Sequence, residues 1–111
     1  MDSYRTIITY RAKQLLNSYV DYIQYTLKDN QAADSVFLDA IDTIAKLEDV
    51  AESLQFCDSP ELREMGYRKV TFLRHKYVML YRVIGDTAYI EAIYHQLQDY
   101  EKLFMKDFGI K

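Results

Sequence analysis

The chain has 111 residues, of which half are apolar and 28% are charged, and its net charge is −3. These proportions exclude a disordered tail and are typical of a compact soluble domain, so we expect one domain spanning residues 1–111. No apolar run approaches the length of about 18 residues that a membrane helix needs, and the first residues lack the basic start and apolar core of a signal peptide, which predicts a cytoplasmic protein with no membrane partner.

The first half of the chain predicts a strand followed by two helices. Residues 4–9 are rich in β-branched and aromatic residues, which favour a strand. Apolar residues then recur at three- and four-residue steps over residues 10–28 and again over residues 31–53, so each stretch predicts a helix with one apolar face. Thr9 and Asn30 are placed to cap the two helices. Adjacent helices of this length predict a helical hairpin.

The second half predicts an antiparallel meander and a final helix. Strand-forming residues dominate three consecutive stretches, which are residues 67–73, 77–84 and 87–94. Gly85 and Asp86 separate the last two, and glycine at the first turn position supplies the positive φ of a two-residue type II′ hairpin. Residues 57–65 have the composition of a loop, and residues 99–108 predict a short helix.

The order of the elements is therefore β-α-α-β-β-β-α. This order predicts an α+β fold in which a mostly antiparallel sheet carries a helical hairpin on one face, because that packing buries both apolar helix stripes. Neither a metal nor another cofactor is expected. Cys57 is the only cysteine, only two histidines accompany it, and no phosphate-binding glycine-rich loop or nucleophile elbow is present.

Charge is distributed unevenly along the chain. Residues 10–55 carry four basic and eight acidic side chains, whereas residues 63–82 carry six basic side chains and one acidic one. Such a basic block can contact phosphates or an acidic partner, although a protein that binds nucleic acid nonspecifically is normally basic as a whole. Solvated charges on strand ends and turns explain the same block equally well.

Several short motifs occur in a recognisable order on these elements. Arg68 opens the second predicted strand, Tyr81-Arg82-Val83 ends the third, Gly85-Asp86 forms an acidic turn, and His95 precedes Asp99 by four residues. In this order and spacing the chain resembles the RelE/ParE toxin superfamily over nearly its whole length, and its ParE branch more closely. The resemblance implies the RelE/ParE-like fold and the toxin half of a bacterial type II toxin–antitoxin pair, with a cognate antitoxin as partner.

Two kinds of target are implied by this superfamily. The RelE-like branch cuts mRNA in the ribosomal A site with basic residues on the open sheet face, and the ParE-like branch acts on DNA gyrase without known chemistry of its own. Val78, Thr71 and Gln98 stand where the RelE-like branch has basic residues, and the sequence pI is about 5.3. These features favour gyrase binding. A RelE-like mRNA endoribonuclease is the alternative, and a non-toxic protein-binding module of the same fold is a second one.

The resemblance also implies the residues of the site. The residues expected to bind the target or the antitoxin are Arg68, Lys69, Tyr81, Arg82 and His95. No residue is assigned a catalytic role unless the chain is an endoribonuclease, in which case the candidates are Lys69, His95 and Asp99. His95 and Asp99 would then form a hydrogen-bonded pair, with Arg68 and Arg82 as phosphate clamps. In the structural alternative Asp99 caps the final helix and the two arginines pair with helix acids.

Overall fold

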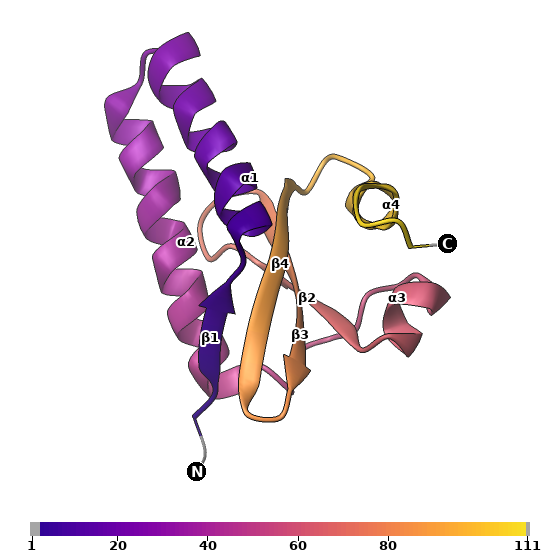
Figure 1. Ribbon diagram of the computed structural model, residues 1–111. Helices are drawn as coiled ribbons and strands as arrows, with labels where there is room; N and C mark the ends of the chain where they lie inside the picture. Colours follow the sequence, from indigo (N-terminus) through magenta and orange to yellow (C-terminus); the bar gives the residue numbers. More distant parts are fainter. Residues whose placement is uncertain (1–2, 111) are drawn as a thin grey trace.

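The computed structural model describes residues 3–110 and contains one four-stranded sheet with helices on both faces (Figure 1). The elements in chain order are β1 (Arg5–Ile8), α1 (Tyr10–Asp21), the π-helical segment η1 (Tyr22–Thr26), α2 (Asn30–Val50), α3 (Pro60–Glu64), β2 (Tyr67–Thr71), β3 (Tyr77–Ile84), β4 (Thr87–His95) and α4 (Tyr100–Asp107). The strand order is β1-β4-β3-β2, with β1 parallel to β4 and the other pairs antiparallel. The predicted α+β class and order are confirmed, and α3 is an additional short helix in the predicted loop.

The two helices of the hairpin begin at side-chain caps. Thr9 caps α1 as predicted, because its Oγ1 accepts a hydrogen bond of 3.2 Å from the backbone nitrogen of Ala12. The cap of α2 is Asp29 and not Asn30, since Asp29 Oδ1 accepts from the nitrogen of Ala32 at 2.9 Å. Asn30 is the first residue of the helix itself.

The first predicted helix changes its winding at Tyr22. The nitrogen of Leu27 donates to the carbonyl oxygen of Tyr22 at 3.1 Å, which is the five-residue step of a π-helix. Lys28 then takes a left-handed φ of 55° and turns the chain into α2. The stretch predicted as one helix over residues 10–28 is therefore helical only to Thr26, and its last turn is wider than that of an α-helix.

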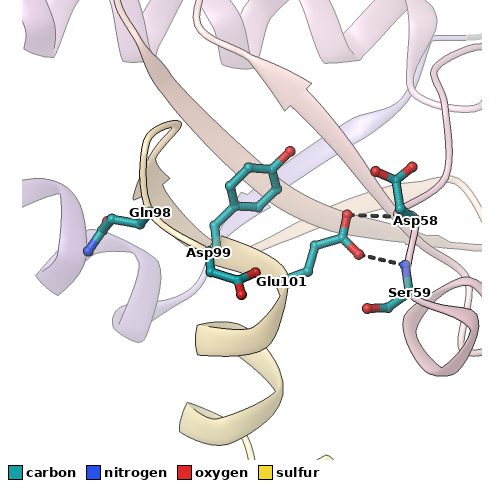
Figure 2. A pocket seen from close by; sticks show the side chains of 6 residues that line it. Asp58, Ser59, Gln98, Asp99 and Glu101 are labelled. Carbon is teal, nitrogen blue, oxygen red and sulfur yellow. Dashed lines mark hydrogen bonds between the residues drawn. The ribbon is translucent and has the colours of Figure 1, made fainter.

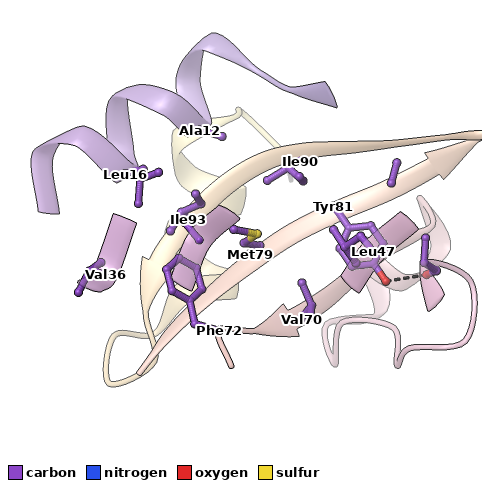
Figure 3. Packing of buried hydrophobic residues seen from close by; sticks show 13 residues of the cluster. Ala12, Leu16, Val36, Leu47, Val70, Phe72, Met79, Tyr81, Ile90 and Ile93 are labelled. Carbon is purple, nitrogen blue, oxygen red and sulfur yellow. Dashed lines mark hydrogen bonds between the residues drawn. The ribbon is translucent and has the colours of Figure 1, made fainter. Parts of the chain in front are cut away.

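The main core lies between the sheet and the helical hairpin (Figure 3). Its buried side chains come from α1, α2 and the hairpin-facing side of the sheet, and they include Ala12, Leu16, Val36, Leu47, Val70, Phe72, Met79, Tyr81, Ile90 and Ile93. These residues recur at helical spacing in α1 and α2 and at alternate positions in the strands, which is the pattern that buries one side of each element.

A second buried cluster lies on the opposite face of the sheet, which we expected to be open. Its members are Cys57, Leu62, Tyr67, Val78, Leu80, Ala92, Tyr94 and Phe104. Helix α4 covers part of this face, and Phe104 packs edge-on against Tyr67 with ring centroids 4.9 Å apart. Burial, with a smaller effect of the Glu101 charge, raises the pKa of the Cys57 thiol to about 12, so the thiol is protonated at neutral pH.

The turn between β3 and β4 forms as predicted. Ile84 pairs with Thr87 across it, and Gly85 has a φ of +64°. Lys28 is the sole non-glycine residue with positive φ within residues 3–110, so Asp86 has a negative φ, as a type II′ turn requires. In the same described range, none of the helices has the length and apolarity that spanning a membrane requires.

Candidate functional site

Lys69 lies in a partly buried charge network beneath α4. Its Nζ is 3.0 Å from Asp58 Oδ2, 3.3 Å from the Tyr100 hydroxyl and 3.4 Å from Glu101 Oε2. Burial lowers the pKa of the Lys69 ammonium, but the hydrogen bonds to Asp58 and Tyr100 and the nearby negative charge outweigh it and raise the pKa above its ordinary value. Lys69 is therefore charged and already compensated by carboxylates.

The partner of Lys69, Glu101, joins α4 to the segment before α3. Its carboxylate accepts hydrogen bonds from the backbone nitrogens of Asp58 at 2.9 Å and Ser59 at 2.7 Å (Figure 2). An open pocket of about 410 Å³ lies here, lined by Asp58, Ser59, Gln98, Asp99, Tyr100 and Glu101. Three of these six side chains are carboxylates, so the pocket disfavours a phosphate group.

Arg82 lies on the same face of the sheet as Lys69 but has different neighbours. Its Nε is 3.1 Å from Glu91 Oε2, and its Cζ lies 4.9 Å from the centre of the Tyr67 ring. Glu91 is the extra residue of a β-bulge, since Leu80 pairs with Ala92 and Tyr81 pairs with Ile90. The Arg82 side chain is 34% exposed, so a partner can reach its guanidinium.

Arg68 and Tyr81 lie on the hairpin-facing side of the sheet. Arg68 donates a hydrogen bond to the carbonyl oxygen of Leu54, and its Cζ lies 3.8 Å from the centre of the Phe56 ring. Tyr81 is fully buried, and its hydroxyl donates to the carbonyl oxygen of Ala51 at 2.6 Å (Figure 3). The expectation that Tyr81 contacts a partner is therefore corrected, because strand alternation turns its ring into the core.

The predicted pairing of His95 with Asp99 is not formed. His95 Nδ1 accepts a hydrogen bond from the nitrogen of Leu97 at 3.1 Å, and its ring packs against Tyr77 at 5.2 Å. The Asp99 side chain is 73% exposed and lies 4.0 Å from Lys102 Nζ. Asp99 occupies the N-cap position of α4, but its side chain makes no capping hydrogen bond there.

The predicted site residues thus do not form one site. Lys69 and Arg82 lie on the α4 face of the sheet, whereas Arg68 lies on the hairpin face. The His95 ring packs against Tyr77, and Tyr77 in turn packs against Tyr19 of α1. Throughout residues 3–110, no group of three or more histidine, cysteine, aspartate or glutamate side chains is arranged to hold a metal ion.

An apolar groove runs along the hairpin beside β1, and we call it the hairpin groove. It has a volume of about 290 Å³ and is lined by Ile8, Lys13, Leu16, Asn17, Phe37, Ala40, Ile41 and Ile44. Phe37 is 43% exposed and Ile41 is 46% exposed. Partly exposed apolar side chains around an apolar groove are typical of a surface that binds another protein segment.

Asp39 in α2 makes buried contacts that were not expected from the sequence. Its buried carboxylate accepts hydrogen bonds from the nitrogens of Leu73 at 3.0 Å and Arg74 at 2.9 Å, and it lies 2.6 Å from His75 Nδ1. Burial raises the pKa of Asp39, but the bonds from His75, Arg74 and Leu73 outweigh burial and hold the pKa below its ordinary value. The burial of Asp39 could have been predicted, because Asp39 lies three residues after Val36 on the buried face of the helix.

Together these contacts define an α+β domain with a hairpin groove on one face and a charge network under α4 on the other. No protein-family model and no curated protein matches the sequence. Among solved structures, the fold is similar to a chain of the "Chromosomal ParDE TA system from P. aeruginosa", with a TM-score of 0.69 and 21% sequence identity. The similarity covers 84% of this chain and 96% of that chain. The predicted RelE/ParE-like fold is therefore confirmed.

Proposed function

We propose that the chain is the toxin of a ParE-like type II toxin–antitoxin pair, which acts in the bacterial cytoplasm by binding DNA gyrase and is neutralised by a cognate antitoxin. The observation that carries this proposal is the fold similarity to a chain of a ParDE toxin–antitoxin system over 84% of this chain. The hairpin groove supports it, because a toxin that is neutralised by a protein needs a surface on which that protein binds.

The antitoxin segment that fits the hairpin groove is an amphipathic helix. Its apolar residues would pack against Leu16, Phe37 and Ile41, as in other complexes in which a helix lies in a groove. Lys13 lies at the same groove and favours an acidic residue on the helix beside it. The binding energy would come mainly from covering the exposed parts of the apolar side chains.

The α4 face favours gyrase binding over mRNA cleavage. Cleavage needs uncompensated cations at the scissile phosphate, whereas Lys69 is already paired with Asp58 and Glu101. Val78 is fully buried, so the position where the RelE-like branch has an arginine lies inside the cluster beneath α4. The pocket beside Lys69 is acidic as well.

Growth and copurification test the antitoxin half of the proposal. Induced expression of the chain should arrest growth, and coexpression with the adjacent small gene should restore growth and yield a complex. Phe37→Asp and Ile41→Asp should each lose the complex. Leu97→Asp is the matched control, because Leu97 is 83% exposed and lies outside the groove. A complex that survives both groove substitutions would place the antitoxin elsewhere.

Two assays identify the target. The purified chain should inhibit supercoiling by gyrase, and primer extension on several transcripts soon after induction should find mRNA intact. Codon-phased cuts that disappear in Lys69→Ala or His95→Ala would establish the endoribonuclease instead. A chain that neither arrests growth nor binds the neighbouring gene product would be a binding module of the same fold.

A further inference from the structure

We propose that Ser35, His75 and Asp39 form a nucleophilic site that reacts with small neutral carboxylic esters. The three side chains form one hydrogen-bonded line. His75 Nδ1 lies 2.6 Å from Asp39 Oδ2, and His75 Nε2 lies 3.4 Å from Ser35 Oγ. This is the order in which a carboxylate orients an imidazole and the imidazole accepts the proton of a serine hydroxyl.

The local fold brings the three residues together from two segments. Ser35 and Asp39 are four residues apart on α2, so their side chains lie on the same face one turn apart. His75 comes from the loop between β2 and β3, which Asp39 holds against the helix through the nitrogens of Leu73 and Arg74. The imidazole is therefore held beside α2 by hydrogen bonds to Asp39 from its own ring and from its loop.

The hydrogen-bond partners of His75 suit this chemistry. Asp39 is held as a carboxylate by its hydrogen-bond donors, and it lies at His75 Nδ1, so it selects the tautomer with the proton on that nitrogen. Nε2 is then free to accept a proton from Ser35. The 3.4 Å distance from Nε2 to Ser35 Oγ is long for a hydrogen bond and is in the range seen before a substrate binds.

The space beside Ser35 indicates the class of substrate. A cavity of about 360 Å³ is lined by Asp29, Gln31, Ala32, Ser35 and His75, which is room for a short ester. Gln31 lines the same cavity, and its side-chain amide is a hydrogen-bond donor of the kind that can stabilise the carbonyl oxygen. The carboxylate of Asp29 disfavours an anionic substrate.

A second cavity extends the site past His75. It has a volume of about 380 Å³, and it shares Asp29, Ala32 and His75 with the first. Its wall includes Lys76 and His95 as well as Ile23, Leu27 and Tyr77, and the apolar end of an ester can lie against these last three.

The proposed reaction needs no reactant other than the ester and water. Ser35 Oγ forms a bond to the carbonyl carbon while its proton passes to His75 Nε2. The bond from that carbon to the alkoxy oxygen breaks, and the departing alcohol takes the proton from Nε2. Water then attacks the acyl-serine with His75 as base, which releases the carboxylic acid and restores the serine hydroxyl.

Covalent labelling tests the site on the full chain. The purified protein is incubated with p-nitrophenyl acetate, whose release of p-nitrophenol gives the rate, or with a fluorophosphonate, and the residue labelled by the fluorophosphonate is located by peptide mass spectrometry. The expected adduct lies on Ser35, is lost in Ser35→Ala, and forms more slowly in His75→Gln by a factor on the order of 10². Ser18→Ala is the matched control and should leave labelling unchanged, because the Ser18 hydroxyl donates to the Leu15 carbonyl oxygen at a distance from His75 in the fold.

Because Asp39 acts through His75, its role must be tested with a measurement that a purely structural role would not change. Asp39→Asn should lower the maximal labelling rate per folded molecule without changing the ester concentration that gives half of that rate. Circular dichroism provides the folded fraction. A folded wild-type protein without an adduct on Ser35 would overturn the proposal, and so would an adduct that forms equally fast in His75→Gln.

Discussion

The ammonium group of Lys69 on β2 lies 3.4 Å from the carboxylate of Glu101 on α4, with side chains that are only 10% and 11% exposed. The same carboxylate accepts hydrogen bonds from the backbone nitrogens of Asp58 and Ser59. One glutamate therefore connects a strand, the final helix and the segment before α3.

Substitution of Glu101 should strongly destabilise the protein. Glu101→Ala leaves two backbone donors without their acceptor and Lys69 without its buried partner, so we expect a loss of about 3 kcal/mol in the free energy of unfolding. Urea unfolding provides the measurement. Lys102→Ala is the control, because its 4.0 Å pair with Asp99 is exposed and should contribute less than about 0.5 kcal/mol. Equal effects of the two substitutions would contradict the network.

Tyr81→Phe should destabilise the domain although it preserves the ring. The substitution leaves the carbonyl oxygen of Ala51 without its 2.6 Å donor inside the core, which costs about 1 to 3 kcal/mol. Tyr10→Phe serves as control, since Tyr10 is 75% exposed. Thermal unfolding of both variants checks the difference, and a Tyr81→Phe variant as stable as the wild type would show that water replaces the hydroxyl.

Substitution of Arg68 should mainly lower stability, whereas substitution of Arg82 should mainly weaken toxicity. Arg68→Ala loses the bond to Leu54 and the stacking on Phe56, so we expect a stability loss of about 1 to 2 kcal/mol. Arg82→Ala should cost about 1 kcal/mol or less because its pair with Glu91 is partly exposed. Under the proposed function, Arg82→Ala should nevertheless weaken growth arrest per folded molecule. If Arg82→Ala arrests growth as strongly as the wild type, Arg82 does not belong to the binding surface.

Asp39 should make stability depend on acid pH. Its folded pKa is lower than its unfolded pKa, so its contribution is present above about pH 4 and is lost as pH falls through the folded pKa. The stability difference between wild type and Asp39→Asn should therefore be largest near pH 7 and shrink below pH 4. The groups around Asp39 are His75, Arg74 and, through Arg74, Asp42. Urea midpoints at pH 7, 5 and 3 provide the test, and a difference that is constant with pH would contradict it.

The strands and the hairpin could be predicted because their signals are local. Runs of β-branched and aromatic residues define β3 and β4, and three- and four-residue steps define α1 and α2. The π-helical winding after Tyr22 leaves a similar apolar pattern, so periodicity does not reveal it. The five residues of α3 are too few to show a period at all.

The candidate site was harder to predict because its contacts join distant positions. Lys69 meets Glu101 across 32 residues, and Asp39 meets His75 across 36. One feature of the candidate site could be predicted from the sequence alone. Arg68 and Lys69 are neighbours in a strand, so their side chains must point to opposite faces and cannot serve the same site.

The position of Cys57 gives the molecule a built-in reporter of local opening. The thiol is fully buried in the cluster beneath α4, and it is the only thiol in the chain. A thiol reagent can reach it only after that cluster has opened, whereas the cluster under the hairpin can stay closed. The rate of Cys57 labelling without denaturant therefore measures detachment of the α4 face separately from unfolding of the whole domain.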